Sequence, residues 1–176
     1  MLGTTRLLPG RGAASLPHST SRHALLAGVM LLCLALLAGC GIPRDPDGTL
    51  ERVQQAGELR VGIVLAPPHT VLRGTTWSGP EVELVQGFAD ELGVRVAWVS
   101  GSEEQTVDRA EHGEVDLMVG GLTTRTGWST QVGLSRPYAE ERDDYGRTAR
   151  RVMAVPLGEN ALLERLERHF DARKQP

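Results

Sequence analysis

The chain has 176 residues, a length that suits one ordinary domain, and a formal net charge of −3. Setting aside the first 39 residues, which hold three arginines and no acid, leaves 16 basic and 22 acidic side chains, a charge of −6. This acidic balance, with no block of five or more like charges in the sequence, argues against a nucleic-acid-binding protein, which needs a basic face.

Residues 1–39 have the layout of a secretory signal peptide. Basic side chains without acids occupy 1–23, and an almost wholly apolar run of about 15 residues follows at 24–38. A membrane-spanning helix needs roughly 20 apolar residues, so a plain membrane anchor is the weaker interpretation. The motif LAGC at 37–40 resembles the lipobox of bacterial lipoproteins, which implies that Cys40 is lipidated and becomes the mature N-terminus. The alternative is a chance cysteine near an ordinary cleavage site.

A short tether and the first strand of the domain come next. Residues 40–48, with two prolines and two aspartates, predict a flexible tether, so that the domain covers 49–176. Thr49 is expected to cap a short helix that ends at Ala56. The run LRVGIVL at 59–65 is nearly all apolar and predicts a buried, parallel-type strand, and the two prolines after it end that strand.

The next segments alternate between helix and strand. After a loop at 71–80, helices are expected at 81–92 and 103–112, the second capped by Ser102, and strands are expected at 94–99 and 115–119. A β-α-β-α-β series with such connections predicts parallel strands with right-handed crossovers. The segments 66–70 and 120–128 then emerge at the same edge of the sheet and line one cleft, where ligands of open α/β sheets usually bind.

The C-terminal part has three segments. Residues 139–151 are highly charged without apolar periodicity, and we expect an exposed loop there. A short strand at 152–156 and a helix that ends near Arg173 follow. His112 and His169 are expected at the surface, and Asp116 is interpreted as part of a solvated strand entry.

The candidate ligand-binding residues lie in or near the cleft. Glycines at 120 and 121 free backbone amides to approach a ligand, and a threonine adds a hydroxyl donor, although two glycines can also simply permit a tight turn. An arginine can neutralise an anionic ligand or remain a solvated loop cation, and tryptophans can wall the ligand or plug the edge of the core. The candidates are Gly120, Gly121, Thr123, Arg125, Trp128, Trp77 and His69.

We find no catalytic or metal-binding pattern in the sequence. After processing at Cys40 there is no cysteine nucleophile, and the G-x-S-x-G elbow is absent. The glycine pair lacks the spacing of phosphate-binding loops, and the histidines lack the spacing of metal ligands. The sequence therefore predicts no cofactor, no metal and no enzymatic activity.

Five segments in order resemble one family. They are GELRVGI, SGPEVELVQGFADELGVRVAWV, GEVDLMVGGLTTRTG, VGLSRPY and RVMAVPLGENALLERLERHF. Together they resemble the first lobe of the extracellular solute-binding proteins of family 3, the receptors of ABC importers for polar amino acids and related solutes. The resemblance implies an α/β fold, one lobe of the periplasmic-binding-protein type II-like fold, with a mostly parallel sheet in three layers and helices on both faces.

The chain departs from this family in two ways. The second lobe is reduced to 139–151, so we expect a single-lobe form. Family members usually place a carboxylate-gripping arginine at the position of Trp128, and Arg125 is the candidate substitute. The resemblance also implies that Gly120, Gly121 and Thr123 receive the ligand carboxylate.

The expected function is a lipid-anchored, substrate-binding component of an ABC importer on the periplasmic side of a bacterial membrane. It would bind a small polar or anionic, amino-acid-like solute without catalysis, in contact with the importer's membrane subunits. The main alternative is a single-lobe scaffold or sensor that acts through a partner protein, which would supply the second wall. A dehydratase-like enzyme on the same fold is the third alternative.

Overall fold

The computed structural model describes residues 45, 47–143 and 145–174. The signal peptide, Cys40 and most of the tether lie outside these residues, so the expectations for them stay predictions. All described residues belong to one compact unit, 43–176, which contains every helix and strand described below. No described helix is both long enough and apolar enough to cross a membrane.

This unit contains four helices and nine strands within its described residues. Their bounds are α2 Thr49–Ala56, β1 Glu58–Ile63, β2 Val71–Arg73, β3 Thr76–Ser78, α3 Pro80–Leu92, β4 Arg95–Ser100, α4 Glu103–Glu111, β5 Leu117–Val119, β6 Val132–Leu134, β7 Ala139–Arg142, β8 Thr148–Arg151, β9 Ala154–Pro156 and α5 Asn160–Lys174.

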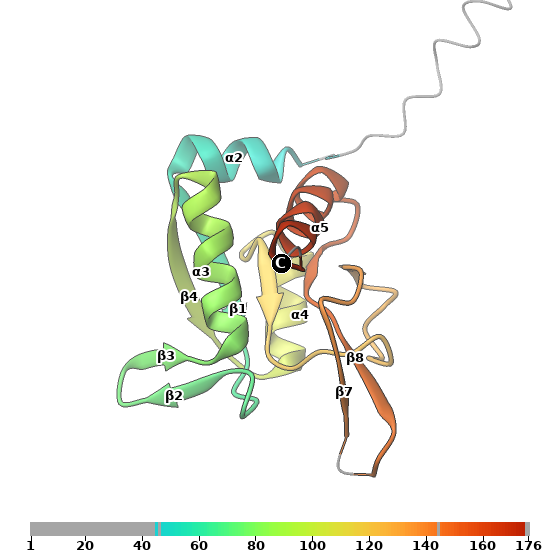
Figure 1. Cartoon of the computed structure of the whole chain (residues 1–176). Helices are drawn as coiled ribbons and strands as arrows, with labels where there is room; N and C mark the ends of the chain where they lie inside the picture. Colours follow the sequence, from blue (N-terminus) through green and yellow to red (C-terminus); the bar gives the residue numbers. More distant parts are fainter. Residues whose placement is uncertain (1–44, 46, 144, 175–176) are drawn as a thin grey trace, which may run out of the picture. The chain divides into compact units, whose positions relative to one another are not determined.

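Five of the strands form one sheet in the order β4-β1-β5-β9-β6. The first three are parallel, as predicted, and β9 runs antiparallel to both of its neighbours. Apolar side chains of β1 join those of α3 and α5 in one buried cluster, and α4 packs against a second cluster on the other face. The predicted mixed α/β fold with helices on both faces of a mostly parallel sheet is therefore confirmed (Figure 1).

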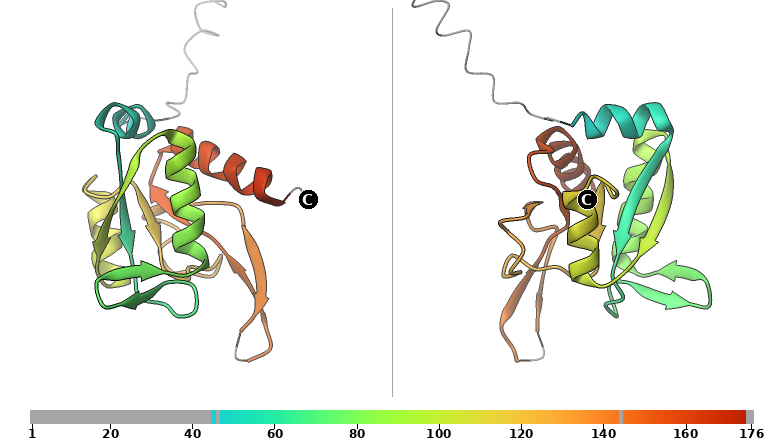
Figure 2. Two further views of the ribbon diagram at one scale, coloured as in Figure 1. Left: turned by 60° about the vertical axis from the view of Figure 1, so that its left-hand side comes forward. Right: turned by 180° about the vertical axis from the view of Figure 1, so that it is seen from behind.

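Two segments that we expected to be loops are β-hairpins. The predicted loop at 71–80 contains the β2–β3 pair, and the charged segment 139–151 contains the β7–β8 pair. Both expectations were wrong because short, exposed strands carry no apolar periodicity. Both hairpins extend from the end of the sheet toward which β1 points (Figures 1 and 2). The fold thus surrounds the carboxyl edge of the parallel strands with two antiparallel ribbons.

Two polar side chains that we expected at the surface are buried. Asp116 is fully buried and accepts hydrogen bonds from Arg52 Nη2 at 2.9 Å and from Arg60 Nη2 at 2.6 Å. His169 is 6% exposed, and its Nδ1 lies 2.6 Å from a carboxylate oxygen of Glu91. These expectations were wrong because the partners are 56 to 78 residues away in the sequence, where no local pattern points to them.

The start of α2 is capped from a distance. Thr49, expected to be the cap, is buried as the first helical residue, and Gly48 is the N-cap without a side-chain bond. The Glu159 carboxylate, at the start of α5, instead accepts hydrogen bonds from the amides of Asp47 and Thr49, both at 3.1 Å. Asp45 accepts from the Leu50 amide at 3.1 Å. The carboxylates of Asp45 and Glu159 therefore hold the backbone at the start of α2.

These two carboxylates have displaced pKa values. Burial, and then a hydrogen bond to Glu159, raise the pKa of Asp45 to about 6. Burial opposes ionisation of Glu159 as well, but hydrogen bonds from Asp45, Thr49 and Asp47 outweigh it and lower its pKa. The folded protein thus holds the proton of the pair on Asp45.

This pair predicts a pH-dependent stability. Because folding raises the pKa of Asp45, its contribution to stability is complete below about pH 4 and is lost as the pH rises through about 6. We expect the free energy of unfolding, measured with urea from pH 4 to pH 7, to fall more steeply in the wild type than in Asp45→Asn. The exposed neighbour provides the control variant, Asp47→Asn, which should keep the wild-type slope. Parallel profiles for the wild type and Asp45→Asn would contradict the assignment.

Candidate functional site

The loop after β5 makes a close contact with the end of β1 that requires glycine. Gly120 has a φ of 143°, and a Cβ atom placed on it would lie 2.5 Å from the Cβ of Val64. Gly121 follows with a φ of 71°, in the left-handed region that favours glycine. The two glycines therefore turn the chain sharply at the carboxyl edge of the sheet, against the first strand.

The amides of both glycines are bound by a buried carboxylate. Gly120 N donates to Glu81 Oε2 at 2.8 Å, and Gly121 N donates to both carboxylate oxygens at 3.1 Å. Glu81 is fully buried in the first turn of α3, and the hydroxyl of Tyr138 donates to it as well. Burial, together with the negative charge of Glu81, raises the pKa of Tyr138. The hydroxyl therefore stays protonated and remains a donor.

This arrangement changes the role expected for the two glycines. Their amides were expected to face a ligand carboxylate, but in the structure they hold the loop to α3 through Glu81. We did not predict Glu81, an acid in the first turn of α3, as a residue of this cluster. Its spacing carried a further signal, since Glu81 lies one helical turn before Val85 on the buried side of α3.

Residues of two loops meet at Gly121, as the topology predicted. A Cβ atom placed on Gly121 would lie 3.2 Å from the Cβ of Ala66 and 3.3 Å from Cδ2 of His69. The His69 side chain is 12% exposed, and its Nε2 lies 3.6 Å from Glu141 Oε1 on β7. The His69 loop is also tied to α3, because Glu81 N donates to the His69 carbonyl at 3.2 Å. His69 and Gly121 therefore belong to one cluster at the edge of the sheet.

The polar part of the loop pairs with the β7–β8 hairpin. Thr123 forms an isolated antiparallel bridge with Arg151, and the Thr124 amide donates to the Arg150 carbonyl at 3.0 Å. Arg125 Nη2 donates to the Thr148 carbonyl at 2.9 Å. The Arg125 guanidinium also lies 3.8 Å from Asp143. Arg125 is thus bound to the hairpin in the place where we expected an anionic ligand.

Two hairpin residues that we did not predict, Arg151 and Glu141, belong to the same cluster. Arg151 Nη1 donates to the Gly121 carbonyl at 2.5 Å, and Arg151 Nε donates to Glu141 Oε1 at 2.6 Å. Both side chains lie on the face of the hairpin that is turned toward His69. A charged segment gives no local signal that identifies which of its side chains point inward, so only the pairing register of the strands reveals them.

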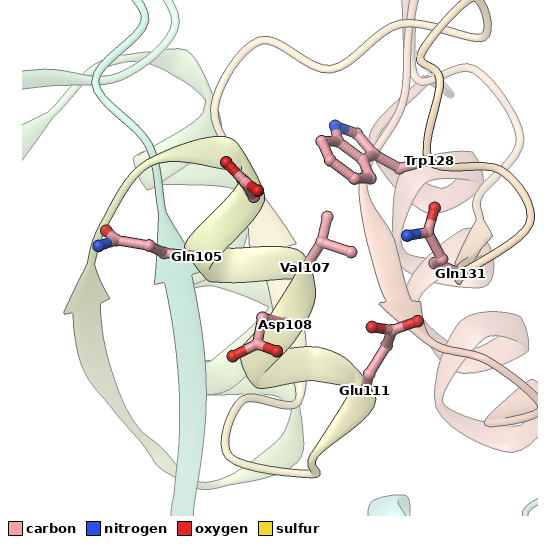
Figure 3. Close-up of a pocket in the computed structure, with 7 residues that line it drawn as sticks. Gln105, Val107, Asp108, Glu111, Trp128 and Gln131 are labelled. Atoms are coloured by element: carbon pink, nitrogen blue, oxygen red, sulfur yellow. The ribbon is translucent and has the colours of Figure 1, made fainter.

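The two candidate tryptophans are on opposite faces of the sheet. Trp77, in β3, packs against the cluster of α3 and α5, whereas Trp128 packs against the cluster of α4. Trp128 lies beside a hollow of about 380 Å³ with Val107 and Gln131 (Figure 3). The remaining lining residues are polar or acidic: Glu104, Gln105, Asp108 and Glu111. The structure therefore brings together His69, Gly120, Gly121 and Thr123, with Arg125 beside them, and places the tryptophans elsewhere.

The described residues hold no group of three or more histidine, cysteine, aspartate or glutamate side chains that could bind a metal ion. This edge offers hydrogen bonding and charge, from Arg151, the carboxylates of Glu81 and Glu141, His69 and the backbone groups of the glycine loop, with Arg125 beside them.

The Glu81 contact predicts a specific loss of stability. Glu81→Gln removes the charge that two amides and a hydroxyl bind in a buried site, and we expect a loss of about 2 kcal/mol in the free energy of unfolding. Glu83→Gln is the matched control, because it removes an exposed charge from the same turn of α3. It should change the stability by no more than about 0.5 kcal/mol. Urea denaturation measures both, and equal effects would argue against a special role for Glu81.

Comparison with curated proteins finds relatives that share this domain. A membrane-bound lytic murein transglycosylase F of Cronobacter sakazakii is 36% identical over 101 residues, which is 56% of this chain and 20% of that protein. The protein of the same name from Aeromonas hydrophila is 36% identical over 88 residues, 49% of this chain and 18% of that protein. The chain thus spans about a fifth of the length of these relatives.

These relatives correct one expectation. We expected no enzymatic activity, but the matched relatives are named as lytic murein transglycosylases, which are enzymes, and they match through this domain. Enzymes can thus contain a solute-binding lobe of this kind. The prediction of no enzymatic activity was wrong, because it was drawn from this domain alone.

Solved structures agree with the fold. The arginine-bound form of domain 1 from TmArgBP superposes with a TM-score of 0.61 at 22% identity, covering 69% of this chain and 97% of that one. An ancestral cationic amino acid solute binding protein gives a TM-score of 0.66 at 14% identity, covering 72% of this chain and 94% of that one. At this level of identity the likeness establishes the fold.

The family model of bacterial extracellular solute-binding proteins, family 3, matches residues 59–175. This match runs from β1 to the end of α5 and contains Glu81, the glycine loop and the hairpin. The chain belongs to the bacterial extracellular solute-binding proteins of family 3.

Proposed function

We propose that this lobe binds a small polar, amino-acid-like solute at the carboxyl edge of its sheet and delivers it to an ABC importer. The observation that carries the proposal is the meeting of the His69 loop and the glycine loop at Gly121, within a chain that belongs to a solute-binding family. Ligands of open α/β sheets bind outside the carboxyl ends of the strands, where two such loops converge.

The position of the protein in the cell is part of this proposal. The LAGC motif at 37–40 supports lipidation of Cys40, and membership of an extracellular family supports the periplasmic side of a bacterial membrane. A lipid-anchored lobe would remain close to the membrane subunits of an importer.

A single lobe is a workable unit for such binding. Domain 1 from TmArgBP, of which the chain covers 97%, is described as arginine-bound. In the present chain the β7–β8 hairpin projects beside the carboxyl edge and supplies Arg151 and Glu141 as a partial second wall. A cleft with so small a wall buries less of a ligand than a closed pair of lobes, so the affinity should be modest.

A second candidate function rests on the curated relatives. The 36% identity to two proteins named as lytic murein transglycosylases supports a lobe that senses fragments of murein and acts through a partner protein. In this alternative the solute at the edge is a small murein fragment and the partner is an enzyme of cell-wall turnover.

A thermal-shift screen of the full chain in detergent tests the proposal. The panel contains amino acids, guanidinium compounds, small organic anions and soluble murein fragments at concentrations up to about 100 mM. A ligand present at 100 times its Kd stabilises a protein by about 2.7 kcal/mol, which raises Tm by several degrees.

The solute class that shifts Tm separates the two candidates. A shift with free amino acids supports the importer, and a shift with murein fragments alone supports the sensor. A panel in which no compound changes Tm would contradict solute capture.

A further inference from the structure

The Arg151 side chain differs from the other arginines of the β7–β8 hairpin. It is 17% exposed, whereas Arg150 and its partner Glu140 are each 59% exposed on the other face of the same hairpin. Arg147, near the tip, is 62% exposed and pairs with Asp143 four residues before it. Arg151 therefore is the hairpin arginine that points into the candidate site.

The Arg151 guanidinium bridges the two halves of the site. On one side Nη1 donates to the carbonyl of Gly121 at 2.5 Å, and on the other Nε donates to Glu141 at 2.6 Å. Its backbone is fixed by the bridge to Thr123 and by a bond from the Tyr138 amide to the Arg151 carbonyl at 3.0 Å. The strand is held in place while the side chain keeps its own rotatable bonds.

The surroundings of this guanidinium favour a cation. The guanidinium pairs with the Glu141 carboxylate, and the buried Glu81 carboxylate binds the hydroxyl of Tyr138, whose amide donates to the Arg151 carbonyl. Without the guanidinium, the Gly121 carbonyl would lose a donor and the Glu141 carboxylate would lose its counter-charge, and such losses are costly when the groups are partly buried.

We propose that the Arg151 guanidinium occupies the cation position of the solute site, so that a solute with a guanidinium or ammonium group binds by displacing it. This inference rests on the proposed function and adds a regulating feature and a ligand class to it. Arg151 acts as a tethered competitor that closes the site in the absence of solute.

The tether sets the strength of this competition. A group held by a short flexible linker acts at an effective concentration in the mM range. A free cation must outcompete it, so the apparent affinity of the wild type is reduced by the fraction of time that the site is open. The competing solute also has to replace the hydrogen bonds that Arg151 gives to Gly121 and Glu141.

Removing the Arg151 guanidinium from the site tests the inference. We would measure binding of L-arginine and ethylguanidinium to the full chain by isothermal titration calorimetry and thermal shift, in the wild type and in Arg151→Ala. If Arg151 fills the position about nine-tenths of the time, its removal should lower the Kd about tenfold. Adding Glu141→Gln to Arg151→Ala should reverse the gain, because it removes the carboxylate that receives the cation.

The hairpin offers a matched control. Arg150→Ala removes an arginine from the neighbouring position of the same strand but on the exposed face, and its Kd should equal that of the wild type. Arg151→Thr, which favours a strand, replaces Arg151→Ala if the alanine variant does not fold. Recovery of a cooperative melt of either variant on addition of ethylguanidinium would also support the inference.

The outcomes separate this inference from the proposed function. If the wild type binds a solute and Arg151→Ala binds it no more tightly, or if Arg150→Ala gains as much, the inference is overturned and solute binding stands. If neither the wild type nor the two Arg151 variants bind any probe at 100 mM, both the inference and the proposed function are overturned.

Discussion

The carboxylate of Glu81 binds the amides of Gly120 and Gly121, and the rest of the site depends on this contact. A buried charge is tolerated only when its hydrogen bonds are supplied, and here two amides and the Tyr138 hydroxyl supply them. The same residue is tied to the His69 loop through its backbone amide. One residue therefore fixes the helix, the glycine loop and the loop after β1 at a common point.

The β7–β8 hairpin completes this edge in a chain that has no second lobe between β6 and β9. Thr123, Thr124 and Arg125 pair with its backbone or side chains, and Arg151 covers the Gly121 carbonyl. Polar groups expected to receive a solute are thus satisfied from within. Solute binding on such an edge is an exchange of partners, since each internal hydrogen bond that is lost must be replaced.

The sequence was sufficient for the fold and for the meeting of two loops at the carboxyl edge of the sheet. Apolar runs and glycine and proline breaks predicted the parallel strands, and the topology predicted that the His69 loop and the glycine loop would meet. The sequence was not sufficient to predict which residues form hydrogen bonds with one another across the fold. Glu81 binds Gly121 40 residues away, Asp116 binds Arg52 64 residues away, and Arg151 binds the Gly121 carbonyl 30 residues away, and local periodicity carries no information about such pairs. The face on which Trp128 packs was also not predictable, because a place in the loop does not fix the direction of a side chain.

Amide hydrogen exchange at Gly120 and Gly121, followed by NMR in the ligand-free full chain, tests the role of Glu81 most directly. We predict that both amides exchange far more slowly than the amide of exposed Gly127 in the same loop, that Glu81→Gln removes this protection, and that Glu83→Gln preserves it. Exchange at Gly120 and Gly121 as fast as at Gly127 in the wild type would show that the two amides are free, which would contradict the account of a site held closed from within.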